Sequence, residues 1–198
     1  LQALKKGTSD AEKVTLSFYV KSNLTGTAVV GLYEHDNNRY IAKSYTIDSA
    51  DTWERKTITF EGDTTGTLDN DNAVSIEVQF YLQAGNNFTS GTLATAWESF
   101  TEANAAVGQT INIASSTDND FFITGVQLEL GSVATPFEHR SYGDELLRCQ
   151  RYYHTILTLA ASSGVSAYIM NGNATARGSF QLATTMRAAG TLVESHSD

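Results

Sequence analysis

The stretch FFITGVQLELGSVATPFEHRSYGDELLRCQRYY, from Phe121 to Tyr153, decides how this chain is organised. Its first ten residues alternate like a β-strand, which predicts that Phe122, Val126, Leu128 and Leu130 share one side. Gly131 and the single proline then end the strand, and a short helix follows. Ser141 and Asp144 predict the helix start, because they fit a capping box that satisfies free amides of the first turn. The pattern predicts that a β-domain ends with this strand and that a helical strut follows it.

Strand patterns also dominate the sequence before this stretch. Residues 14–20 alternate cleanly, and further strands are expected at 28–32, 40–47, 53–60 and 74–82, with a short one at 108–113. The connections are rich in Asn, Asp, Gly and Thr, and no helix is interleaved. These features predict an all-β fold of two packed antiparallel sheets, a β-sandwich. Trp53, at the start of a regular strand, is expected to pack in the core or between the sheets.

Three parts are predicted: the sandwich over residues 1–138, the strut over 139–154 and a partial C-terminal β-region over 155–198. In the last part, strands are expected at 155–161, 165–171, 178–183 and 190–194. These segments are rich in small residues, so about 45 residues of this kind need a partner surface to fold.

The 121–153 stretch, together with LKKGTSDAEKVTLSFYVKSNLTGT and SYTIDSADTWERKTITFEGDTTGTL upstream, resembles sequences near the end of many virion structural and tail-fibre proteins of marine bacteriophages. The resemblance covers roughly residues 1–153 and then thins to short echoes such as Thr185-Met186-Arg187-Ala188. It implies a jelly-roll module related to carbohydrate-binding modules, made in the cytoplasm of a host bacterium and placed in the outer parts of the virion. It carries over no catalytic or binding residues.

Charge and composition narrow the classes of partner. The chain has 13 basic and 22 acidic residues, a net charge of -9, and its basic residues are scattered. A groove for nucleic acid is therefore not expected, and an acidic surface would be repelled by anionic lipids. No apolar run is long enough to insert into a membrane. The first residue is Leu rather than Met, which indicates a piece of a longer polypeptide.

The residue types needed for catalysis do not occur in recognisable spacing. His35, His139, His154 and His196 lack metal-ligand spacing, and neither a nucleophile turn nor a phosphate-binding glycine loop is found. The single cysteine, Cys149, excludes an intrachain disulfide and is expected to be buried on the apolar side of the helix. We therefore expect a protein that is not an enzyme and needs no cofactor.

Two groups of acidic loop residues are candidate ligands for a structural calcium ion: Asp63, Asp69 and Asp71, and separately Asp118 and Asp120. Their carboxylates are the hard oxygen ligands that calcium prefers. The spacing of an EF-hand is absent, however, and Asp or Asn in turns ordinarily caps its own backbone. Ordinary turn chemistry is the favoured interpretation.

Sugar recognition needs aromatic rings that stack on the apolar side of a pyranose, flanked by polar groups that bond its hydroxyls. Aromatic residues in loops or on the outward side of strands are the candidates: Tyr33, Tyr40, Tyr81, Phe88 and Trp97. Packing in the core is an equally good interpretation of Trp97.

The helix offers an apolar surface made by Leu146, Leu147, Tyr152 and Tyr153. Three copies packed about an axis would bury this surface, so a homotrimer is expected. The function expected from the resemblance is that of a non-enzymatic virion structural protein of the tail or its fibres, which contacts other tail proteins and host-surface glycans. The alternatives are a carbohydrate-binding module of a bacterial polysaccharide-degrading enzyme, and a purely architectural capsid or tail decoration protein.

Overall fold

The structure is a computed structural model that describes residues 2–69, 71, 73–152, 167–169, 176–178 and 184–185. The chain divides into two compact units, Leu1–Glu138 and His139–Asp198.

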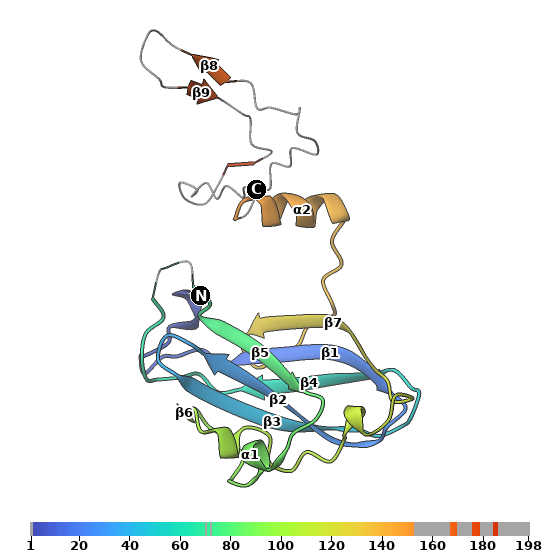
Figure 1. The fold of residues 1–198 in the computed structure, drawn as a ribbon. Coiled ribbons are helices and arrows are strands. Elements are labelled where there is room, and N and C mark those ends of the chain that lie inside the picture. Colours follow the sequence, from blue (N-terminus) through green and yellow to red (C-terminus); the bar gives the residue numbers. More distant parts are fainter. Residues whose placement is uncertain are drawn as a thin grey trace. The chain divides into compact units, whose positions relative to one another are not determined.

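The first unit contains two antiparallel sheets (Figure 1), which confirms the predicted all-β, two-sheet architecture. One sheet has the order β4-β1-β7, with β1 at Val14–Ser22, β4 at Glu54–Phe60 and β7 at Phe121–Leu130. The other has the order β5-β2-β3-β6, with β2 at Gly26–Glu34, β3 at Arg39–Ile47, β5 at Ile76–Tyr81 and β6 at Glu98–Ser99.

Short helical turns occupy the irregular parts of this unit: η1 at Gln2–Leu4, α1 at Asn86–Thr89, η2 at Glu102–Asn104 and η3 at Ile113–Ser115. The prediction of a short strand at residues 108–113 is wrong. There the amides of Thr110 and Ile111 instead both donate to the carbonyl of Thr27, just inside β2.

The main core lies between the two sheets and follows the predicted alternation. Leu16, Phe18 and Val20 of β1 are fully buried, and they pack in one cluster with inward residues of β2, β3 and β5. The Phe18 ring makes edge contacts with the rings of Tyr45 at 5.2 Å and Phe80 at 5.1 Å, so it joins the two sheets. Burial of such side chains is the main favourable term in folding.

The first part of the outer face of β1 is also buried, although its residues are polar. Thr15 is 0% and Ser17 is 2% exposed. Residues 131–138, which we call the strap, fold back over this face. The Thr15 hydroxyl donates to the Gly131 carbonyl at 2.7 Å, and the Thr135 hydroxyl and amide both donate to the Glu129 carboxylate. The sequence motif after β7 therefore has a local structural role, which is to cover the sheet that β7 completes.

A bulge in β7 decides which of its side chains face the core. The pairing of β1 with β7 shifts between Ser17 and Tyr19, opposite Gly125, whose φ is +58°. Leu128 pairs with inward Leu16, but beyond the bulge it is Ile123 that pairs with inward Val20. The expectation that Phe122 shares a side with Val126, Leu128 and Leu130 is therefore wrong, because one extra residue reverses the alternation.

Trp53 corrects another expectation, since it is not a core residue. It precedes β4 and is 47% exposed. Its ring lies 6.5 Å from that of Phe122, which pairs with Lys21 and points outward with it. The bulge thus exposes an aromatic residue beside a second one.

The second unit contains helix α2 at Tyr142–Gln150, which begins where the capping pattern predicts. The Ser141 side chain accepts a hydrogen bond from the amide of Asp144. Leu146 and Leu147 are exposed within the chain, and so is Cys149, which was expected to be buried. Tyr152 is exposed, whereas Tyr153 lies outside the described residues.

Little of the C-terminal β-region is described. Strand β8 at Ala167–Ile169 lies within the predicted strand at 165–171, and it pairs with β9 at Ala176–Gly178, which begins before the expected 178–183. The strands expected at 155–161 and 190–194 lie outside the described residues. In the part of the chain that the structure describes, no helix has the length and apolar character needed to cross a bilayer.

Replacement of Gly125 by Ala tests the bulge. A Cβ atom at this left-handed position would lie 3.2 Å from Cδ2 of Tyr19. We expect Gly125→Ala to lower the free energy of unfolding by about 1–2 kcal/mol, measured by urea denaturation. Gly85→Ala is the control, because Gly85 has φ -88° and open space around its Cα, and it should change stability by less than about 0.5 kcal/mol. Equal effects of the two changes would contradict the bulge.

Candidate binding surfaces

Four of the five aromatic residues proposed for sugar binding lie together on the outer side of the β5-β2-β3-β6 sheet. Tyr33 of β2 pairs with Tyr40 of β3, and Val29 of β2 pairs with Tyr81 of β5, so the three tyrosines point away from the main core. Phe88 of α1 joins the same cluster. The outward direction predicted for Tyr81 is confirmed by this register.

Tyr40 is part of the scaffold of this cluster and is closed to a ligand. Its side chain is fully buried, and its hydroxyl donates to the Ala105 carbonyl at 3.0 Å. The ring lies across Gly31, where a Cβ atom would be 2.1 Å from the tyrosine oxygen. Burial raises the pKa of Tyr40 far above its ordinary value, so the phenol stays neutral. Tyr40 thus holds the irregular segment of residues 84–109 against the sheet.

Around Tyr40 a partly exposed surface remains, formed by Tyr33, Tyr81, Phe88 and Phe100, which we call the tyrosine face. The Tyr33 ring lies 5.0 Å from that of Phe100, and the Tyr81 ring lies 6.5 Å from that of Phe88. The rings thus pack against one another in pairs, and each of the four residues stays partly exposed.

Polar groups border the tyrosine face. The Tyr33 hydroxyl donates to Oδ1 of Asn38 at 2.8 Å, and the Tyr81 hydroxyl donates to Oε1 of Gln79 at 3.1 Å. His35 pairs with Glu77 at 3.0 Å. Aromatic carbon next to amide, hydroxyl and carboxylate groups is the arrangement that a sugar ring with its hydroxyls requires.

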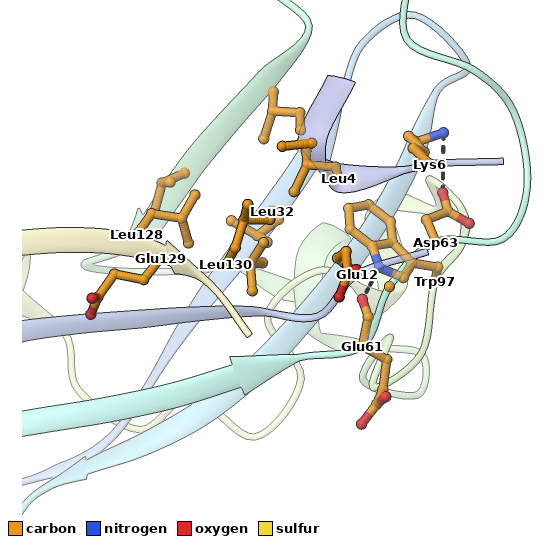
Figure 2. A pocket seen from close by; sticks show the side chains of 15 residues that line it. Leu4, Lys6, Glu12, Leu32, Glu61, Asp63, Trp97, Leu128, Glu129 and Leu130 are labelled. Carbon is orange, nitrogen blue, oxygen red and sulfur yellow. Dashed lines mark hydrogen bonds and ion pairs between the residues drawn. The ribbon is translucent and has the colours of Figure 1, made fainter. Parts of the chain in front are cut away.

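Trp97 lies elsewhere, in an apolar cleft between the edge strands β7 and β5 (Figure 2). Its indole Nε1 donates to the Glu61 carbonyl at 2.6 Å, and its ring packs against the main core. The cavity measures about 330 Å³, and Leu4, Leu32, Leu128 and Leu130 contribute to its apolar lining. Leu128 and Leu130 are 43% and 51% exposed, although they face the opposite sheet. The space between the two sheets is thus open along the β7 edge, and Trp97 lines this opening.

A network of buried charges closes one end of this cleft. Asp63 accepts two hydrogen bonds from the Arg39 guanidinium, at 2.6 Å and 2.9 Å. The Lys6 ammonium lies 3.3 Å from both the Asp63 and the Glu34 carboxylates, and the side chains of Lys6, Asp63 and Glu34 are at most 5% exposed. Two acids and two bases therefore neutralise one another and join the N-terminal segment to β2, β3 and the loop after β4.

The acidic residues considered for calcium do not converge on a common point. Both oxygens of Asp63 are engaged by cations, so a metal ion there would meet Arg39 and Lys6. Asp69 accepts from the amide of Asp71, which is ordinary turn chemistry. Asp120 accepts from the amide of Asn23, a long-range hydrogen bond that joins two loops. Within the described ranges, no group of three or more His, Cys, Asp or Glu side chains is placed to hold a metal ion.

No protein-family model matches this chain, and searches of curated proteins and of solved structures found no similar protein. The resemblance to virion structural proteins therefore stays a prediction.

Removing Asp63 tests the role of the charge network. Asp63→Ala leaves Arg39 without its buried counter-charge and leaves Lys6 with Glu34 alone, so we expect a loss of about 3–5 kcal/mol in the free energy of unfolding. Asp10→Ala, at an exposed position, is the control and should change stability by less than about 0.5 kcal/mol. If millimolar calcium raised the melting temperature of the parent but not of Asp63→Ala, the assignment of Asp63 to the ion pairs would be wrong.

Proposed function

We propose that this chain is a non-enzymatic structural protein of a bacteriophage virion, placed in the tail or its fibres, where it attaches to host-surface glycans through the tyrosine face. Its first unit would be a jelly-roll module of the carbohydrate-binding kind. The observation that carries glycan attachment is the row of partly exposed rings of Tyr33, Tyr81 and Phe88, bordered by Gln79 and Asn38. The assignment to a virion rests on the sequence resemblance over residues 1–153.

The ionisable groups beside the tyrosine face favour binding over catalysis. His35 and Glu77 form a pair with each other. Among the residues that the structure describes, neither forms a hydrogen bond with a nucleophilic hydroxyl or thiol, as a catalytic base would need.

Each contact of this kind would be weak. Stacking on one ring and two or three solvent-exposed hydrogen bonds correspond to a dissociation constant of about a millimolar. Repeated copies on one particle would raise the apparent affinity through effective concentration. Weak single sites therefore suit a protein that is displayed in many copies.

A glycan array followed by calorimetry tests the proposal. We expect the full chain to bind a bacterial surface glycan, and Tyr81→Ala or Tyr33→Ala to weaken that binding about tenfold, equivalent to about 1.4 kcal/mol. Tyr142→Ala is the control, because Tyr142 is an exposed tyrosine of the second unit. Melting curves establish that each variant is folded.

Two results would redirect the proposal. No binding by the parent across the array favours the architectural alternative, a capsid or tail decoration protein without a ligand. Binding confined to plant or algal storage polysaccharides favours a module of a polysaccharide-degrading enzyme.

We also propose that three copies of the chain assemble through α2, where Leu146 and Leu147 are 40% and 47% exposed. Tyr152 and Tyr153 would extend this interface. The double change Leu146→Asp with Leu147→Asp should convert a trimer to a monomer in light scattering, and melting of the parent should depend on its concentration. Leu128→Lys, which changes a residue of the apolar cleft, is the variant with which the double change in α2 is compared. A parent that is a stable monomer contradicts the trimer, and dissociation by Leu128→Lys alone would place the contact at β7 instead.

A further inference from the structure

A second aromatic surface lies on the outer side of the other sheet, at one end of strands β4, β1 and β7. Trp53 directly precedes β4, Lys21 lies near the end of β1, and Phe122 is the second residue of β7. Lys21 pairs with Phe122, and Glu54 pairs with Val20, so the three side chains form one row across neighbouring strands. We call this row the tryptophan platform.

The platform is open to solvent to a greater extent than the tyrosine face. Trp53 and Phe122 are 47% and 46% exposed, and their ring centroids lie 6.5 Å apart. Two large rings left open side by side are unusual for a surface without a ligand, because their burial is a strong favourable term.

The end of β1 holds both rings in place. The Ser22 carbonyl accepts from the amide of Asp51 at 2.8 Å, and the Ser22 hydroxyl donates to the Asp120 carbonyl at 2.6 Å. These bonds fix the chain two residues before Trp53 and two residues before Phe122. The platform is therefore set by backbone pairing, and a ligand need not order it.

Lys21 gives the platform a positive charge that no acid neutralises. Its ammonium lies 4.7 Å from the centroid of Phe122 and 5.8 Å from that of Trp53. The ammonium forms neither a hydrogen bond nor an ion pair with any residue that the structure describes. By contrast, Lys5, Lys13 and Lys56 pair with Glu12, Glu61 and Glu54. In a chain of net charge -9, an uncompensated cation between two open rings favours an anionic ligand with an apolar face.

We propose that the tryptophan platform binds a carboxylated sugar, such as a hexuronic acid unit of an acidic polysaccharide. The apolar side of the pyranose stacks on Trp53 or Phe122, and the carboxylate lies beside the ammonium of Lys21. A stretch of nucleic acid also combines rings with negative charge, but it needs several clustered cations along its backbone, and the platform has one. This site is on a different sheet from the tyrosine face and does not depend on binding there.

Nuclear magnetic resonance of the full chain with trigalacturonate tests the platform directly. We expect a dissociation constant on the order of millimolar. The indole signal of Trp53 should shift during the titration while that of Trp97, in the cleft, stays in place. Fully methyl-esterified trigalacturonate keeps the rings and removes the charge, so it should bind about three- to fivefold more weakly.

Variants separate stacking from charge. Trp53→Ala should weaken trigalacturonate binding about tenfold, and Phe122→Leu should weaken it less. Lys21→Met should remove the preference for the acid over the ester, together with the salt dependence of binding. Tyr81→Ala should leave all of these values unchanged, which distinguishes this site from the tyrosine face.

Three results would overturn the proposal: equal binding of acid and ester by the parent, an unchanged affinity in Lys21→Met, and tighter binding of oligothymidylate than of trigalacturonate. The proposal would also be overturned if the Trp53 signal did not shift at about 10 mM trigalacturonate, which is about ten times the expected dissociation constant. Lys21→Met replaces the ammonium of a half-buried side chain by an apolar group of similar length, so it tests the charge even if Trp53→Ala does not fold.

Discussion

Burial of the inner face of β1, together with Thr15 and Ser17 on its outer face, is the constraint on which the first unit depends. Its inner face supplies Phe18 to the main core, while its outer face carries hydroxyl groups that need cover and hydrogen-bond partners. The strap provides both, because Thr135 bonds to Glu129 while Gly131 accepts from Thr15. The Thr135 and Gln127 hydrogen bonds also hold the pKa of Glu129 below its usual value, so the carboxylate stays charged in this role. A buried strand with polar outward residues is possible only because this segment returns over it.

The second sheet meets the same requirement with different chemistry. Its outer face is covered by residues 84–109, which are anchored on the buried ring and hydroxyl of Tyr40. Each sheet is thus partly covered by an irregular segment, and the tyrosine face, the tryptophan platform and the β7 edge remain open. The surfaces available for binding are therefore what the two covering segments leave free.

The sequence predicted the strands well because a period of two survives wherever one face is apolar. The bounds of β7 agree with the expectation to the residue, and β1 is only two residues longer than expected. The period does not reveal a single inserted residue, so Gly125 reversed the expected direction of Phe122. Trp53 was wrongly predicted to lie in the core, because a strand pattern does not say whether other parts of the chain cover the side chain of its first residue. Tyr40 was predicted as a ligand contact because it flanks the turn at residues 35–38, and nothing in the sequence indicated the segment that covers it.

The arrangement of charges was the least predictable part, and it connects the two proposed surfaces. A run such as Glu61-Gly62-Asp63 has the composition of a calcium loop, but the partners of Asp63 come from β3 and from the N-terminal segment, far away in sequence. Long-range pairing with acids engages Lys6, Lys13 and Arg39. Lys21 escapes it because the outward neighbours of Lys21 are rings. As a result, the tyrosine face has a carboxylate at its border, in Glu77, whereas the tryptophan platform has a free ammonium. Two aromatic surfaces of opposite local charge would select different sugars, so one module could engage a neutral and an acidic unit of the same surface polysaccharide.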